Sequence, residues 1–190
     1  MSAAQPVSQS AEVERPAGES ARVFFALWPD APTRERLARA AERLRGACGG
    51  RMPKPENIHL TLAFLGQIPR SRLDPLMATA RRVTGRSHGL PMERFGWFRR
   101  NRVAWAGPLR TPGALLKLVG SLEEALRQDH FPCDVRPYEA HVTLLRKASC
   151  RDLPPLEDSF EWPVREFVLV ESELNQAGSV YTIIGRWHLG

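Results

Sequence analysis

The sequence predicts an α+β fold built mainly from antiparallel sheets. Segments typical of strands and helices alternate along the chain, yet several strands follow one another in hairpin-like pairs. The order strand–helix–strand also occurs twice, ending once at HLTL (59–62) and once at HVTL (141–144). This repetition, which lies in the pattern more than in residue identity, indicates a weak internal duplication.

The folded part of the chain is expected to be a single domain of residues 21–190. Residues 1–20 are rich in Ser, Ala, Pro and Glu, which predicts a disordered tail, and they lack the apolar core of a signal peptide. No apolar run approaches the roughly 20 residues needed to cross a bilayer. We therefore predict a cytoplasmic protein without a membrane partner.

In the first half of the chain, strand patterns alternate with two helices. A strand at 21–29 is followed by a helix at 30–50, for which Asp30 is the expected N-cap and a Gly-Gly pair the end. A second strand is expected at 57–66 and a second helix at 71–85. The apolar residues of the first helix have the spacing of one buried face: Leu37, Ala40, Ala41 and Leu44.

The second half contains one helix and five expected strands. The helix is predicted over 111–129, with Thr111 as its N-cap and Pro112 at its first position. The strands are recognised by short apolar runs bounded by turn residues. They are expected at 90–98, 101–108, 140–147, 164–172 and 179–189.

Two short segments have the same form of His, apolar residue, Thr and Leu. They begin at His59 and at His141. With five histidines in the chain, about 0.02 such matches are expected by chance, and two are present. A single histidine on a strand is more often structural than catalytic. The duplicated motif therefore favours a functional role.

Strand geometry predicts where these side chains point. Because side chains alternate between the two faces of a strand, His59 and Thr61 share one face. Leu60, Leu62 and Phe64 are expected on the opposite face, in the core. The same alternation pairs His141 with Thr143. If the two halves pack with approximate two-fold symmetry, two imidazoles and two hydroxyls meet in one groove.

Such a group of four side chains is suited to acid/base chemistry. One neutral histidine can take a proton from a nucleophile, and a second, protonated histidine can give one to a leaving group. The threonine hydroxyls can donate hydrogen bonds to oxygens that gain charge. This chemistry requires no metal and no cofactor, and none is expected. It fits transfer at phosphorus, above all the opening of a cyclic phosphodiester.

The charge of the chain favours a polyanionic partner. The net charge is +6, and 24 of the 27 basic residues are arginine. An excess of arginine can reflect the codon usage of a GC-rich genome. The planar guanidinium of arginine is nevertheless suited to phosphate, which accepts two parallel hydrogen bonds from it.

The cysteines predict neither a metal site nor a disulfide. Cys48, Cys133 and Cys150 lie far apart and form no CxxC pair. We expect three free thiols in a reducing compartment.

The motifs carry a resemblance to a known family. HLTLAFLG (59–66) and HVTLLRKA (141–148) resemble the two HxTx signatures of the 2H phosphoesterase superfamily. More closely, residues 21–188 resemble the bacterial RNA 2′,3′-cyclic phosphodiesterases, also called 2′-5′ RNA ligases. The resemblance implies a bilobal fold, with two mainly antiparallel sheets flanked by helices around a central groove. It further implies metal-independent hydrolysis of 2′,3′-cyclic phosphate ends of RNA to 2′-phosphate ends, and 2′-5′ ligation in vitro. A monomer is expected.

The resemblance also implies residue roles. His59 corresponds to the proton donor to the departing 3′ oxygen, and His141 to the proton acceptor that activates water. Thr61 and Thr143 complete the catalytic set. Arg146 matches an arginine that holds phosphate, but strict alternation places it on the face of the strand that points away from His141 and Thr143. It can reach the groove only if the strand ends or bulges near Leu145.

Two questions stay open at this point. The aromatic residue that stacks on a base is not identified among Phe24, Phe25, Trp97, Phe98, Trp105 and Tyr181. The substrate could also be a small cyclic nucleotide or an ADP-ribose cyclic phosphate, and a binding module that holds RNA or a nucleotide without turnover is an alternative from another class. A binder, however, gains little from two histidines placed for proton transfer.

Overall fold

The computed structural model describes residues 20–133, 137–175 and 178–190. Three α-helices lie within these ranges: α1 (Ala31–Cys48), α2 (Leu73–Ala80) and α3 (Gly113–Gln128). Short 3₁₀ turns are η1 (Pro55–Asn57), η2 (Arg70–Arg72) and η3 (Arg99–Asn101). The strands are β1 (Ser20–Leu27), β2 (Leu60–Pro69), β3 (His88–Met92), β4 (Arg94–Phe98), β5 (Val103–Gly107), β6 (Val142–Arg146), β7 (Phe160–Val164), β8 (Glu166–Asn175) and β9 (Gly178–His188).

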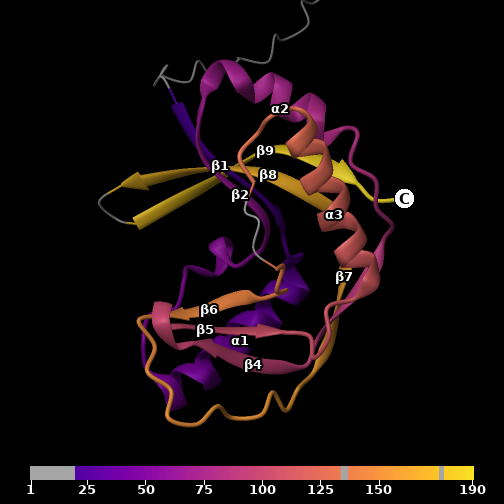
Figure 1. The fold of residues 1–190 in the computed structure, drawn as a ribbon. Helices are drawn as coiled ribbons and strands as arrows, with labels where there is room; N and C mark the ends of the chain where they lie inside the picture. Colours follow the sequence, from indigo (N-terminus) through magenta and orange to yellow (C-terminus); the bar gives the residue numbers. More distant parts are fainter. Residues whose placement is uncertain (1–19, 134–136, 176–177) are drawn as a thin grey trace, which may run out of the picture.

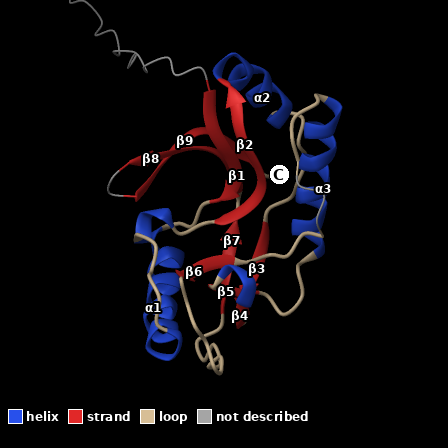
Figure 2. Ribbon diagram, turned by 60° about the vertical axis from the view of Figure 1, so that its left-hand side comes forward, coloured by secondary structure: helices blue, strands red, loops and turns tan. Residues whose placement is uncertain are grey.

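These strands form two antiparallel sheets. Seven strands form one sheet in the order β4-β5-β6-β2-β1-β8-β9, and β3 pairs with β7 in the other. In Figures 1 and 2, β4, β5 and β6 lie with α1 in one part of the molecule, and β1, β2, β8 and β9 lie with α2 and α3 in the other. The predicted α+β class with antiparallel sheets and flanking helices is confirmed. The division into one bilobal domain stays a prediction.

The two parts of the large sheet meet at one residue pair. Between β2 and β6 the described ladder contains only Leu60 opposite Val142, whereas β1 and β2 pair along their full length. Both residues of this pair are fully buried. The junction of the two halves therefore lies one residue from each HxT histidine.

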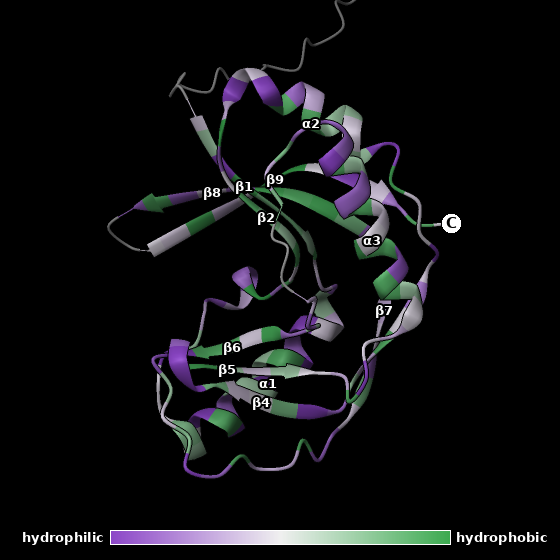
Figure 3. Cartoon of the chain, in the orientation of Figure 1, coloured by the Kyte–Doolittle hydropathy of each residue, from purple (hydrophilic) through white to green (hydrophobic). Residues whose placement is uncertain are grey.

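Buried helix faces and strand faces supply the core. The predicted apolar face of α1 is buried at all four positions, and the helix packs on β5 and β6. Its N-cap is Asp30, whose carboxylate accepts a hydrogen bond from the Thr33 amide. Figure 3 shows hydrophobic residues along β1, β2 and β8 and alternating character along the helices. No helix in the described part of the chain is long and apolar enough to span a bilayer.

Several predicted boundaries differ from the structure. The strand expected at 90–98 is divided, because β3 pairs with β7 and β4 pairs with β5. β7, which contains Pro163, was not predicted. In a two-stranded sheet it is an edge strand, where proline is tolerated. Helix α3 begins after Pro112, whose carbonyl accepts the first helical bond, so Thr111 is not its cap.

The predicted tail lies almost entirely outside the described residues. Residues 1–19 are not described, and Ser20, which was assigned to the tail, is the first residue of β1. Ser20 pairs with Pro69, the last residue of β2. The boundary of the described fold is thus one residue earlier than expected.

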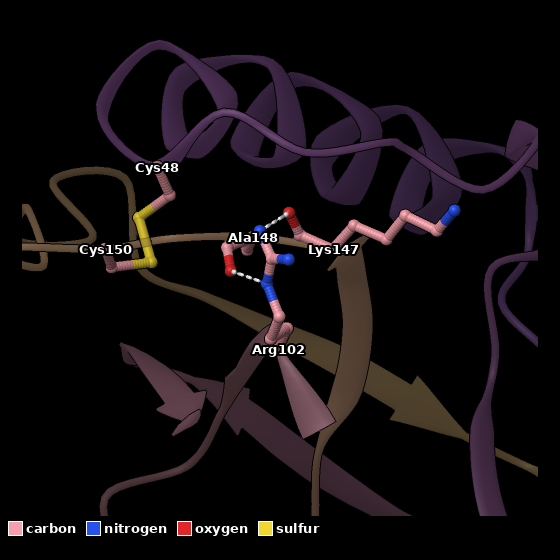
Figure 4. Close-up of a disulfide and its surroundings, with 5 residues drawn as sticks. All are labelled: Cys48, Arg102, Lys147, Ala148 and Cys150. Atoms are coloured by element: carbon pink, nitrogen blue, oxygen red, sulfur yellow. Dashed lines mark hydrogen bonds between the residues drawn. A yellow bond between two sulfur atoms is a disulfide. The ribbon is translucent and has the colours of Figure 1, made fainter. Parts of the chain in front are cut away.

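The prediction of three free thiols is wrong. Cys48, at the end of α1, and Cys150, after β6, form a disulfide across 102 residues, as Figure 4 shows. Cys133 is not part of this bond. Sequence spacing could not reveal the pair, because the packing of α1 against β6 brings the two residues together. Beside the disulfide, the Arg102 guanidinium donates to the carbonyl oxygens of Lys147 and Ala148 (Figure 4).

Reduction of this disulfide is expected to destabilise the fold. A closed loop of this length restricts the unfolded chain, so its opening should lower the free energy of unfolding by about 2–4 kcal/mol. Urea unfolding with and without a reductant measures the difference.

The control is the Cys48→Ala/Cys150→Ala variant, whose stability should not respond to the reductant. Identical unfolding curves for the oxidised and reduced wild-type protein would contradict the prediction.

Candidate active site

A groove of about 650 Å³ lies along the junction of the two halves. The five predicted site residues, which come from two distant segments, all line it. They are His59, Thr61, His141, Thr143 and Arg146. The remaining lining residues come from β1, β2, the segment between α1 and β2, and the β8–β9 hairpin: Arg22, Phe24, Arg51, Met52, Pro53, Lys54, Asn57, Phe64, Ser172, Gly178, Ser179 and Tyr181.

The antiparallel junction explains how the two motifs meet. Leu60 lies opposite Val142. Continuing this register by one residue in each direction places His59 opposite Thr143, and Thr61 opposite His141. Opposite residues of an antiparallel pair share a face of the sheet. The four polar side chains therefore lie on the face away from the buried leucine and valine, as the alternation predicts.

A bulge in β6 brings Arg146 to the same face. The pairing with β5 joins Trp105 to Thr143 and Ala104 to Leu145, so Leu144 is an extra residue. Leu144 and Leu145 are both fully buried, and the alternation resumes with Arg146 on the groove side. Arg146 was expected to reach the groove only if the strand ended or bulged near Leu145, and the bulge lies one residue before it.

A second bulge, in β2, overturns the prediction for Phe64. Phe25 of β1 pairs with Ala63 and Ala26 pairs with Thr61, so Leu62 is the extra residue. Leu62 and Ala63 are both buried, and Phe64 is 45% exposed and lines the groove instead of the core. Each motif therefore presents its sixth residue, Phe64 or Arg146, beside its histidine and threonine. Alignment of the two motifs in the sequence, which sets Phe64 against Arg146, could have identified Phe64 as a groove residue.

Both histidines are held in the same way by the backbone. Nδ1 of His59 lies 2.7 Å from the carbonyl oxygen of Asn57, and Nδ1 of His141 lies 2.8 Å from that of Glu139. Because a carbonyl oxygen can only accept, each Nδ1 carries the hydrogen and donates it. Nε2 is then the atom of each ring that is available to a ligand.

Aromatic rings surround His59. Trp28 stacks on its imidazole with ring centres 5.2 Å apart, and Phe24 and Tyr181 lie within 5.4 Å. Burial among these rings disfavours the charged imidazolium and lowers the pKa of His59 to about 4, although the bond to Asn57 opposes the shift. The charges of Arg146 and His141 lower this pKa further. In the ligand-free protein His59 is therefore neutral at pH 7.

The other candidate aromatic residues have different surroundings. Phe98 meets the ring of His141 edge-on with centres 5.0 Å apart, and Trp105 lies behind it. Phe25 is fully buried in the core. Two aromatic residues outside the predicted candidates also contribute: Phe64 lines the groove, and Trp28 stacks on His59.

Positive charge dominates the groove. Among the described residues that line it, four have cationic side chains and none is Asp or Glu. The four are Arg22, Arg51, Lys54 and Arg146. Arg99, Arg100 and Arg102, the arginines of the link between β4 and β5, do not line the groove. A groove with this charge is suited to an anion that carries more than one phosphate.

The described residues contain no cluster of three or more His, Cys, Asp or Glu side chains suited to a metal ion. Independence of the reaction from metal stays a prediction.

Comparison with known proteins agrees with this geometry. A family model described as LigT like phosphoesterase matches residues 27–105 and 108–181. The chain belongs to the LigT-like phosphoesterase family. The RNA 2′,3′-cyclic phosphodiesterase of Escherichia coli is 33% identical to it over 90% of this chain and 98% of that protein. The protein of the same name from Thermus thermophilus is 33% identical over 88% of this chain and 90% of its own length.

A solved LigT-like structure shows the same fold. The E. coli LigT protein, in a crystal structure with 3′-AMP, has a TM-score of 0.81 and 32% identity over 90% of this chain and 99% of that one. The resemblance inferred from the two motifs is thus confirmed at the level of the family.

The environment of His59 predicts its titration. NMR detection of its ring protons should give a pKa of about 4 in the ligand-free protein. Trp28→Ala opens one side of the aromatic enclosure and should raise this pKa towards the ordinary value near 6.5, because water can then solvate the charged ring.

The signal is assigned from its loss in a His59→Gln variant. A His59 pKa of 6.5 or above in the wild-type protein would contradict the described enclosure.

Proposed function

We propose that this LigT-like phosphoesterase is an RNA 2′,3′-cyclic phosphodiesterase that produces 2′-phosphate ends. The observation that carries the proposal is the pairing of Leu60 with Val142, which sets two His-Thr pairs side by side in a cationic groove. The names of its relatives support the same substrate, and the bound 3′-AMP of the E. coli structure supports a groove that accepts a nucleotide.

The proposed reaction assigns one proton transfer to each histidine. Nε2 of His141 takes a proton from water, whose oxygen forms a new bond to phosphorus while the bond from phosphorus to the 3′ oxygen breaks. His59 gives its proton to that 3′ oxygen. The burial that lowers the pKa of His59 makes its imidazolium a stronger acid, which suits a donor. The negative charge of the entering phosphate opposes the shift and lets His59 gain a proton when substrate binds.

The threonines and Arg146 have a separate role in this proposal. The phosphorus centre carries additional charge on its oxygens as water attacks. Hydroxyls of Thr61 and Thr143 and the Arg146 guanidinium stand on the histidine face, where they can donate to these oxygens. This support is strongest in the transition state and so lowers the barrier.

Phe64 is the proposed base platform. It is a half-exposed aromatic side chain in the groove, on the face that carries His59, and the Arg22 guanidinium lies 5.1 Å from its ring centre. Stacking on such a ring tolerates any base. A terminal nucleotide could thus be held by its base on one side and its cyclic phosphate on the other.

A second candidate substrate is a small cyclic nucleotide, because the phosphate and base contacts named above would hold it equally well. Joining of RNA ends by a 2′-5′ bond is the same chemistry with a ribose 5′-hydroxyl in place of water. We further propose that the enzyme acts as a monomer in the cytoplasm, where its RNA substrate occurs. The Cys48–Cys150 bond is unusual for that compartment.

Removal of either imidazole should abolish most of the turnover. His59→Ala and His141→Ala should each lower kcat on an oligonucleotide with a 2′,3′-cyclic phosphate end by ~10²–10⁴-fold, the usual effect of losing a proton-transfer group. Chromatography that separates the 2′- from the 3′-phosphate product measures rate and isomer together.

His188→Ala is the matched control, because this histidine is exposed at the end of β9 and does not line the groove. Its activity, and the activity of wild-type enzyme in EDTA, should be unchanged. Full activity in either groove variant, or a 3′-phosphate product, would refute the proposed reaction.

A further inference from the structure

Arg51 and Arg146 form an in-register pair at one side of the groove. The amide of Arg51 donates to the carbonyl of Arg146 at 2.8 Å, and the amide of Arg146 donates to the carbonyl of Arg51 at 2.8 Å. Two residues that exchange both backbone bonds are a directly opposed antiparallel pair with side chains on one face. Both side chains line the groove. Two guanidinium groups thus start from neighbouring positions on the same surface.

This arrangement is electrostatically unfavourable without an anion. Like charges directly opposite on a sheet repel each other. In the described part of the chain, no Asp or Glu lines the groove to compensate their charge. The segment that carries Arg51 contributes a third cation, Lys54, to the same groove. A phosphate bound between these groups would remove the repulsion and form charge-assisted hydrogen bonds.

The backbone around Arg51 is committed to this position. Gly50 has φ +91°, and a Cβ there would lie 2.8 Å from the Arg146 carbonyl oxygen, so a side chain is excluded. The Ser149 amide donates to the Cys48 carbonyl at 2.9 Å, and Cys48 is bonded to Cys150. The turn before Arg51 and the segment after Arg146 are therefore joined next to the pair.

The cationic side chains of the groove exceed the single negative charge of the reacting phosphate. A cyclic phosphodiester carries one negative charge, and Arg146 is the groove cation whose charge acts on His59, beside the reaction centre. Arg51 is paired with Arg146 at the end of β6, three residues after Thr143, so its side chain starts from a position beyond the HxT residues. The additional cations imply a second phosphate on the substrate.

We propose that Arg51, assisted by Lys54, binds the phosphodiester on the 5′ side of the terminal nucleotide of an RNA strand. This inference rests on the proposed function, because a 2′,3′-cyclic phosphate occupies the 3′ end and every other phosphate lies on its 5′ side. The subsite makes the enzyme prefer an RNA end over a cyclic mononucleotide. Arg51 thereby acts as a specificity residue and takes no part in proton transfer.

A short substrate series tests the subsite. The kcat/KM is measured for 2′,3′-cyclic AMP, for the same nucleotide with a 5′-phosphate, and for a dinucleotide with a 2′,3′-cyclic end. In wild-type enzyme the second and third substrates should exceed the first by about 10-fold or more, since each adds one charge-assisted phosphate contact.

Arg51→Gln should remove this gain while leaving kcat/KM on 2′,3′-cyclic AMP within about two-fold. With a longer cyclic-ended oligonucleotide, log kcat/KM decreases as log salt increases. In Arg51→Gln this decrease should be shallower than in wild-type enzyme by about 0.7, the value for one phosphate contact on a single strand. Arg51→Lys should retain part of the gain. Arg110→Gln, at an exposed arginine outside the groove, removes the same net charge and should leave the series unchanged.

Each other outcome overturns the subsite. Equal losses on all three substrates would place Arg51 at the reacting phosphate, and a gain that persists in Arg51→Gln would show that it binds no second phosphate. A gain for the dinucleotide but not for the 5′-phosphorylated nucleotide would assign the contact to the second nucleoside. Inactivity of the wild-type enzyme on every substrate would instead refute the proposed function itself.

Discussion

The site depends on one backbone register, the antiparallel pairing of Leu60 with Val142. These two buried residues are the only described pair between β2 and β6, and they fix how the halves of the large sheet meet. A shift by one residue would turn each histidine to the opposite face, because side chains alternate along a strand. Burial of the leucine and the valine therefore stabilises the position of the proposed catalytic side chains as well as the core.

The two bulges extend this constraint along the strands. Regular strands would bury Phe64 and turn Arg146 away from the groove, whereas one extra residue between each threonine and the sixth motif position brings both to the histidine face. The bulged positions, Leu62 and Leu144, are buried, so each bulge also adds an apolar side chain to the core. Packing and site geometry are satisfied by the same local irregularity.

The sequence was informative where a pattern is local. Helical spacing predicted the buried face of α1, and strand alternation predicted that His59 and Thr61 share a face. Repetition of the motif at His141 favoured a functional role, which an isolated histidine would not have done. Two features that depend on contacts between distant segments were missed. The Cys48–Cys150 bond and the stacking of Trp28 on His59 both require the tertiary fold. Phe64 was assigned to the core because strict alternation takes no account of a bulge.

The chemistry of the groove combines an aromatic enclosure with positive charge. His59 is neutral in the free protein because apolar rings exclude water from it, while the cations nearby attract the phosphate that favours its charged form. In the proposed reaction, substrate binding and protonation of His59 are therefore linked, because the phosphate that the arginines bind also favours the charged form of the histidine. In each histidine, Nδ1 donates a hydrogen bond to a backbone carbonyl oxygen, so Nε2 is left for the proposed reaction.

The dependence of kcat/KM on pH tests the two-histidine account most directly. A cyclic-ended oligonucleotide should give a bell-shaped profile in the wild-type enzyme, since one histidine must be neutral and the other protonated. The residual activity of His141→Ala should lose the fall at low pH, and that of His59→Ala should lose the fall at high pH. A flat wild-type profile between about pH 5 and 8, or both limbs persisting in either variant, would contradict acid/base catalysis by this pair.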